Sequence, residues 1–199
     1  MNVLRLDDLD RLYPEAHGAA VRKVQPRLTP AYRAWIERAR FVVVSTVGPE
    51  GTDGSPRGDA GPVVAVVDDR TLLLPDWQGN NRLDSLRNIV RDGRVSLMFM
   101  VPGCTDVVRV NGTAVVTDDA DVLARFTQGG RKPRTVVVIT LAEVYFQCAK
   151  ALMRSALWSG EDLSAGLPTA GQILKEADAG IDPADYDAKY PGLLRDSLW

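Results

Sequence analysis

The chain has 199 residues, of which 45% are hydrophobic and 25% are charged, and its formal net charge at pH 7 is −2. These values are typical of a globular protein that fits one domain with a few appended helices. The slightly negative charge argues against a general nucleic-acid-binding protein, which is normally basic. No apolar run approaches the ~20 residues that span a bilayer, so neither nucleic acid nor a membrane is an expected partner.

Cysteine and histidine are scarce in this chain. The two cysteines, Cys104 and Cys148, lie far apart and form no CxxC pair, and His17 is the only histidine. Disulfide frameworks and zinc sites need more ligands than this, so we expect no metal. The first ten residues are charged and lack the apolar centre of a secretion signal. We therefore expect a cytoplasmic location.

In chain order, the pattern predicts a short N-terminal helix within residues 4–24, and then a helix from Thr29-Pro30 to about residue 40. Thr is a favoured N-cap, and proline suits the first helical position. A turn is predicted at 48–51, and Gly112 inside a strand suggests a bulge. Further helices are predicted at 81–91, 118–126, 149–157, 170–177 and 183–190, and β-branched strands at 41–47, 63–67, 71–74, 95–101, 107–117 and 135–146.

These strands are joined mostly by turns instead of regular crossover helices. This order favours a mainly β, antiparallel architecture with flanking helices (α+β) over a doubly wound parallel sheet.

The first candidate cluster is Ser55-Pro56-Arg57-Gly58-Asp59, expected at the mouth of a hairpin. Arg57 can contact a phosphate or ring carbonyl, Gly58 allows close backbone approach, and Asp59 can accept a hydrogen bond. The same residues are also typical of a solvated surface turn, and composition alone does not separate the two readings.

The second cluster is Asn80-Asn81-Arg82, which leads into the predicted helix 81–91. Free N–H groups at a helix start bind anions. An arginine in the first turn opposes the helix dipole, so an anionic partner would explain Arg82. Ordinary helix capping by Asn80 or Asn81 remains the alternative.

The third cluster lies in the predicted helix 149–157, where Lys150, Arg154 and Trp158 follow one another at i, i+4 spacing. Two cations and an indole on one stripe suit a phosphate and a flat ring. A solvated basic face with a packing tryptophan explains the pattern equally well.

Together the three clusters and the Arg109-Val110-Asn111-Gly112 segment, in this order, resemble the pyridoxamine 5′-phosphate oxidase-related, FMN-binding split-barrel proteins. The resemblance covers residues 29–158. It implies a six-stranded antiparallel split β-barrel and a homodimer with FMN at the subunit interface. Residues 1–28 then form an N-terminal helical segment, and residues 159–199 a helical tail packed on the barrel or the partner subunit.

The resemblance also implies roles for the three clusters. Arg57, Gly58 and Asp59 would edge the flavin ring, and Asn80, Asn81 and Arg82 would hold the ribityl-phosphate end. The third cluster would close the site, and could do so from the partner subunit. Val107 stands where the authentic oxidases place a polar cofactor contact, so the resemblance supports FMN binding more than pyridoxamine oxidation.

The leading functional hypothesis is an FMN-dependent oxidoreductase that acts on an unidentified small molecule. No residue is an obvious acid or base, so no catalytic residue is assigned. The alternatives are a flavin- or deazaflavin-type reductase and a non-enzymatic FMN-binding protein for storage or sensing. A haem-handling split barrel is disfavoured because His17 lies outside the motif region.

Overall fold

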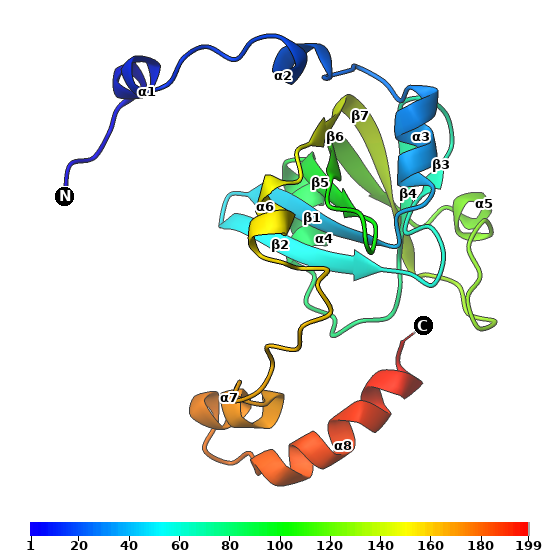
Figure 1. Cartoon of the computed structure of the whole chain (residues 1–199). Helices are drawn as coiled ribbons and strands as arrows, with labels where there is room; N and C mark the ends of the chain where they lie inside the picture. The colour runs from blue at the N-terminus through cyan, green and yellow to red at the C-terminus, as the bar shows by residue number, and fades with distance from the viewer. Residues whose placement is uncertain (199) are drawn as a thin grey trace.

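The computed structural model describes residues 1–198 and shows one antiparallel sheet with helices around it (Figure 1). The sheet has seven strands in the order β2-β1-β5-β6-β7-β4-β3. The strands are β1 Phe41–Gly48, β2 Gly51–Gly58, β3 Ala65–Val66, β4 Thr71–Asp76, β5 Arg94–Met100, β6 Val107–Thr117 and β7 Thr135–Gln147.

The predicted six-stranded barrel is corrected to a seven-stranded open sheet. The additional strand is β2, which pairs along its whole length with β1, from Phe41 opposite Gly58 to Gly48 opposite Gly51. The predicted strand at 63–67 shortens to Ala65–Val66. Within residues 1–198 the two edge strands, β2 and β3, are not paired with each other, so the sheet stays open.

The strand β2 escaped detection because its apolar content is low. Its half-buried positions are Asp53, Ser55 and Arg57, and exposed residues alternate with them. The period of two is that of a strand, but polar side chains occupy the inward positions. Ser55 and Arg57, expected at a hairpin mouth, therefore lie on an edge strand and face inward.

The core lies against one face of the curved sheet. Val42 of β1, Leu97 of β5 and Val110 of β6 are completely buried. They form one cluster with Ile36 of α3 (Pro30–Ile36) and Ile89 of α4 (Asp84–Arg91). These two helices cover the sheet because their apolar side chains need a partner surface.

The predicted start of α3 is confirmed. The Oγ1 atom of Thr29 accepts a hydrogen bond from the backbone N–H of Tyr32 at 3.3 Å, and Pro30 occupies the first turn. The helix ends at Ile36 instead of residue 40, after which the chain leads directly into β1.

Several other helix boundaries differ from the sequence prediction. The helix expected at 4–24 is two short helices that lie apart from the sheet (Figure 1). The helix predicted at 149–157 ends at Arg154, and Ala156 adopts a left-handed backbone with φ of 49°. The remaining helices are α1 Leu6–Leu12, α2 Ala19–Arg22, α5 Ala120–Leu123, α6 Lys150–Arg154, α7 Ala170–Ala177 and α8 Pro183–Asp196.

The helices α7 and α8 of the C-terminal tail pack against each other, below the sheet in Figure 1. The last residue of the predicted tail, Trp199, lies outside the described residues. Across residues 1–198, every helix is too short or too polar to traverse a bilayer.

The bulge predicted at Gly112 is confirmed. The register of β6 against β7 shifts between Asn111 and Gly112. A Cβ atom on Gly112 would lie 2.1 Å from the backbone oxygen of Thr140. No side chain fits there, so β7 can follow β6 around the bend only if this position is glycine.

We expect Gly112→Ala to lower the free energy of unfolding by about 1–3 kcal/mol, because the added methyl group forces the two strands apart. Gly54→Ala in β2 is the matched control, since its Cβ atom would meet nothing within 4 Å. Urea denaturation of both variants measures the difference. Equal losses in the two variants would show that close approach at Gly112 is unimportant.

Candidate functional site

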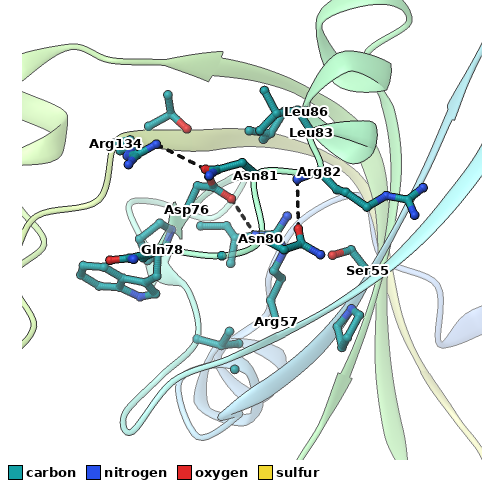
Figure 2. A pocket seen from close by; sticks show the side chains of 18 of the residues that line it. Ser55, Arg57, Asp76, Gln78, Asn80, Asn81, Arg82, Leu83, Leu86 and Arg134 are labelled. Carbon is teal, nitrogen blue, oxygen red and sulfur yellow. Dashed lines mark hydrogen bonds and ion pairs between the residues drawn. The ribbon is translucent and has the colours of Figure 1, made fainter. Parts of the chain in front are cut away.

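A pocket of about 810 Å³ lies between the two ends of the open sheet (Figure 2). One wall is residues 55–58 of β2, and the opposite wall is residues 74–76 of β4 and 134–135 at the start of β7. The loop 77–83, Leu86 of α4, Val63 and Leu198 complete the lining. The candidate site is therefore the gap between the unpaired ends of the sheet, which we call the split. Its walls come from segments that are far apart in sequence.

An ion pair bridges this split. The Nη1 atom of Arg57 on β2 lies 2.6 Å from the Oδ1 atom of Asp76 on β4, and the two side chains are only 26% and 19% exposed. The Nε atom of Arg57 is also buried, but it has no hydrogen-bond partner among the described residues. A buried guanidinium donor without an acceptor is costly, so a ligand that supplied an acceptor here would be stabilised.

Asp59 fixes the loop beside the pocket instead of lining it. Its carboxylate accepts hydrogen bonds from Trp77 Nε1 at 2.9 Å, from Gln128 Nε2 at 3.3 Å and from the backbone N–H of Gly61 at 3.2 Å. These protein donors hold Asp59 against the pocket loop. Of the first predicted cluster, Arg57 and Gly58 line the pocket and Asp59 supports it.

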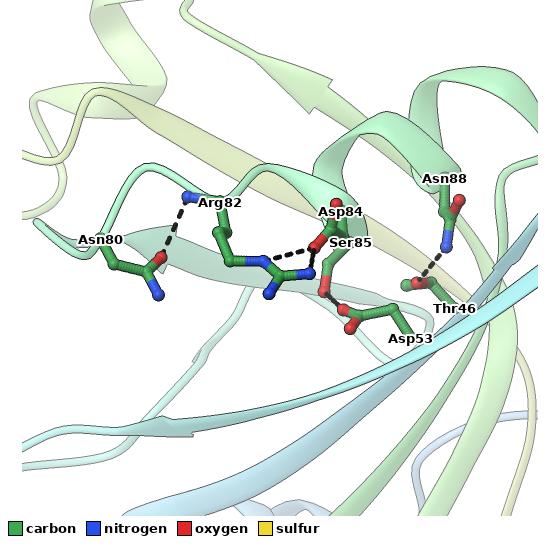
Figure 3. Close-up of polar contacts among 7 residues, drawn as sticks. All are labelled: Thr46, Asp53, Asn80, Arg82, Asp84, Ser85 and Asn88. Atoms are coloured by element: carbon green, nitrogen blue, oxygen red, sulfur yellow. Dashed lines mark hydrogen bonds and ion pairs between the residues drawn. The ribbon is translucent and has the colours of Figure 1, made fainter. Parts of the chain in front are cut away.

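The second cluster reaches the pocket, but not as the start of a helix. The helix α4 begins at Asp84, so Arg82 precedes it. The Oδ1 atom of Asn80 accepts from the backbone N–H of Arg82 at 3.0 Å (Figure 3). Asn81 has a positive φ of 58°. Both asparagines therefore shape a tight loop at the pocket wall.

Arg82 has a protein partner, which the sequence analysis did not foresee. Its guanidinium lies 2.9 Å from the Oδ2 atom of Asp84, in the first turn of α4, and its side chain is 79% exposed (Figure 3). The anionic partner that the sequence predicted for Arg82 is thus the Asp84 carboxylate for part of its guanidinium group. An exposed pair of this kind is weak and leaves the other guanidinium donors available.

Polar contacts hold α4 in place at the pocket edge (Figure 3). The hydroxyl of Ser85 donates to the Asp53 carboxylate of β2, and Asn88 Nδ2 donates to Thr46 Oγ1 of β1 at 3.1 Å. Ser85, Asn88 and Thr46 are all buried. Buried polar groups of this kind stabilise one arrangement of helix and sheet, because any shift leaves them unpaired.

The third cluster lies outside the pocket of its own chain. Lys150 and Arg154 lie at i, i+4 spacing on α6 as predicted, but Trp158 follows the end of that helix, so the predicted stripe does not extend to it. The Nε1 atom of Trp158 donates to the backbone oxygen of Cys104 at 2.8 Å, at the turn between β5 and β6. None of the three residues lines the pocket.

Arg134 and Thr135 are pocket residues that the sequence analysis missed. Arg134 Nη1 donates to Asn81 Oδ1 at 3.3 Å (Figure 2), and Thr135 pairs with Asp76 where β7 meets β4. The Oγ1 atom of Thr135 is buried without a partner among the described residues. The basic loop that precedes β7 was the sequence feature that could have indicated these residues. Only the pairing of β4 with β7 brings them to the pocket.

The pocket combines an apolar surface with positive charge. Its charged lining residues in the described chain are Arg57, Arg82 and Arg134 against the single carboxylate of Asp76. Its apolar lining includes Val63, Leu74, Leu83 and Leu86. An organic molecule with a flat apolar part and an anionic group matches this surface. No group of His, Cys, Asp and Glu suited to a metal ion occurs among residues 1–198.

The sequence profile of the family "Pyridoxamine 5′-phosphate oxidase" matches residues 28–148, which is more than half of the chain. The chain belongs to this family. The match spans the sheet, the pocket loop and α4, and it ends just before α6. It confirms the resemblance drawn from the ordered clusters.

Solved structures similar to this chain are also found. A variant of HupZ from Group A Streptococcus is 17% identical, with a TM-score of 0.50 over 60% of this chain and 98% of that chain. A protein from Lactobacillus delbrueckii described as a pyridoxamine 5′-phosphate oxidase is 25% identical, with a TM-score of 0.47 over 61% and 95%. An FMN-binding protein from Syntrophomonas wolfei is 14% identical, with a TM-score of 0.42 over 58% and 88%. No curated protein matches the chain.

We expect Asp76→Asn to lower the free energy of unfolding by about 1–3 kcal/mol, because it leaves the half-buried Arg57 guanidinium without its counter-charge. The matched control is Asp84→Asn, which removes the exposed partner of Arg82. That loss should stay below about 1 kcal/mol. Chemical denaturation compares the two, and a loss at Asp84 as large as that at Asp76 would contradict the bridging role.

Proposed function

We propose that the pocket between β2 and β4 binds FMN and that the protein is an FMN-dependent oxidoreductase acting on a small molecule. The observation that carries the proposal is the pair of buried, unpartnered polar atoms in the pocket-lining residues, Arg57 Nε and Thr135 Oγ1. One donates and the other can donate or accept, which suits the polar edge of a flavin ring or a ribityl chain.

The dimensions and charge of the pocket fit this cofactor. A volume of about 810 Å³ lies within the range of small-molecule and cofactor sites. The apolar residues Leu74, Leu83 and Leu86 offer a surface for the flat ring, and Arg82 with Arg134 offers charge to the phosphate. The Oδ1 atoms of Asn80 and Asn81 accept hydrogen bonds from the backbone N–H of Arg82 and from Nη1 of Arg134.

The residues of this chain position the cofactor and its surroundings, while FMN supplies the electron transfer. Arg57, held by Asp76, lines the pocket, and its Nε donor has no partner among the described residues. Asp59 holds Trp77 and Gln128, and thereby the loop that forms one wall. Among the described lining residues there is no His, Cys, Lys or Tyr, and the one carboxylate is paired with Arg57. The contribution of the protein is therefore orientation and exclusion of water more than proton transfer.

The proposal includes a homodimer in which the partner subunit completes the site. Lys150, Arg154 and Trp158 lie outside the pocket of their own chain. Exposed apolar side chains surround this segment, with Phe146, Met153 and Leu157 exposed by 41%, 67% and 53%. Such a patch is typical of a contact surface. A second copy that buries it could bring the third cluster to the opposite pocket.

Mass spectrometry of the ligand released from purified protein tests the main proposal, followed by a screen of electron donors and acceptors. FMN in the purified protein, reduced by NAD(P)H or a reduced deazaflavin, would identify a reductase. FMN that is inert to every donor and to pyridoxamine phosphate would indicate a binding protein without catalysis. A colourless protein that takes up no added FMN would refute the proposal.

We expect Arg82→Ala and Arg134→Ala each to weaken FMN binding by about tenfold or more, because a charge-assisted hydrogen bond to phosphate is lost. Riboflavin, which lacks the phosphate, should bind these variants as it binds the wild type. Fluorescence titration measures both affinities. The control is Arg94→Ala, an exposed arginine that pairs with Asp92 at the start of β5. Equal weakening of riboflavin would contradict the phosphate assignment.

We expect Arg154→Ala to weaken FMN binding even though this residue lies outside the pocket of its own chain. Mixed dimers of Arg82→Ala and Arg154→Ala, formed by coexpression, should regain tight binding at about one quarter of all sites, since one pocket of each heterodimer then carries neither change. Isothermal titration counts these sites. Absence of any tight sites in the mixture would show that Arg154 does not act across the subunit interface.

A further inference from the structure

The C-terminal residues 169–198 form an arm that its own contacts hold together. The Oγ1 atom of Thr169 accepts from the Gln172 backbone N–H at 3.2 Å, and the Asp187 Oδ1 atom accepts from the Gly171 N–H at 2.8 Å. The rings of Tyr186 and Tyr190 stack with their centroids 5.4 Å apart. The Gly171–Asp187 hydrogen bond joins α7 to α8, and the other two contacts stabilise α7 and α8 individually.

An exposed linker joins the arm to α6. Within the described part of the chain, the hydrogen bonds and ion pairs of residues 169–198 all join members of the arm to one another. The linker 159–168 is exposed throughout. Gly160 and Gly166 there have φ of 79° and 81°, in the left-handed region. An exposed linker with two such glycines can change direction at low cost, which is typical of a hinge.

The end of this arm reaches the candidate FMN pocket. Leu198 is one of the residues that line the pocket, together with residues of β2, β4 and the loop 77–83. Its side chain is 59% exposed, so it stands at the mouth of the pocket and not in its interior. In Figure 1 the hairpin lies away from the sheet, and the chain beyond α8 turns back towards it.

We infer that the arm is a lid: it seats Leu198 in the mouth of the pocket and must swing away on the linker 159–168 for a ligand to enter or leave. The inference rests on the proposed function for the choice of FMN as the ligand. In the closed position the leucine excludes water from the pocket and limits the size of the second molecule that reaches it. Leu198 is therefore a residue that determines which substrates are admitted.

A lid has a kinetic signature that a fixed wall lacks. Removing a wall contact speeds dissociation alone, whereas removing a lid speeds both entry and exit of the ligand. Two variants test this: a chain that stops after Asp196, and full-length Leu198→Ala. The control is Leu167→Ala, a 67% exposed leucine of the linker that does not line the pocket.

Stopped-flow mixing, followed by quenching of FMN fluorescence, gives both rate constants. We expect the shortened chain, which lacks residues 197–199, to show association and dissociation each faster by about fivefold or more, because it has lost the leucine at the pocket mouth. Leu198→Ala should change both rates in the same direction, and Leu167→Ala should change neither. Rates equal to those of the full chain, or a change in dissociation alone, would overturn the lid.

Hydrogen exchange without flavin separates this inference from the proposed function. If the arm covers the mouth, the backbone N–H groups of the loop 77–83 should exchange faster in the shortened chain than in the full chain. Faster exchange in a protein that binds no FMN would retain the lid and refute the FMN proposal. Unchanged exchange, together with tight FMN binding, would refute the lid and leave the FMN proposal intact.

Discussion

The ion pair between Arg57 and Asp76 is the contact on which the site depends. It joins β2 and β4, which lie near opposite ends of a seven-stranded sheet whose edges are not paired. In a closed barrel, backbone hydrogen bonds would fix the distance between these ends. Here the half-buried Arg57–Asp76 pair fixes the distance between the two ends, and the hydrogen bond from Trp77 to Asp59 adds a second connection. The gap that remains is the pocket.

The same arrangement explains the polar inner face of β2. Asp53 contacts Ser85 of α4, Arg57 contacts Asp76 of β4, and Asp59, just beyond the strand, contacts Trp77. Polar side chains at successive inward positions are costly unless each finds a partner. Each contact lies on a different neighbouring segment, so the strand holds the pocket loop, α4 and β4 in one geometry. An apolar strand would pack there but would specify the position of these segments less sharply.

Membership of the pyridoxamine 5′-phosphate oxidase family and the chemistry of the pocket are independent observations that agree. The family match comes from residues 28–148, whereas the arginines and the unpartnered atoms come from geometry. Neither observation names a substrate. Under the proposed function, the bound cofactor is responsible for the reaction and the protein controls access and orientation.

The sequence by itself determined the local features of this protein. β-branched runs located six of the strands, Thr29 marked the start of α3, and Gly112 marked the bulge, because each depends on residues nearby in the chain or on the bare backbone of glycine. The family also followed from the order of the motifs. Only the tertiary structure decided the rest. It showed β2 as a strand, paired Arg82 with Asp84, added Arg134 and Thr135 to the pocket, and placed Trp158 outside it. These outcomes depend on which strands pair across the sheet and where a short helix ends, and such long-range contacts leave no periodic signal in the sequence.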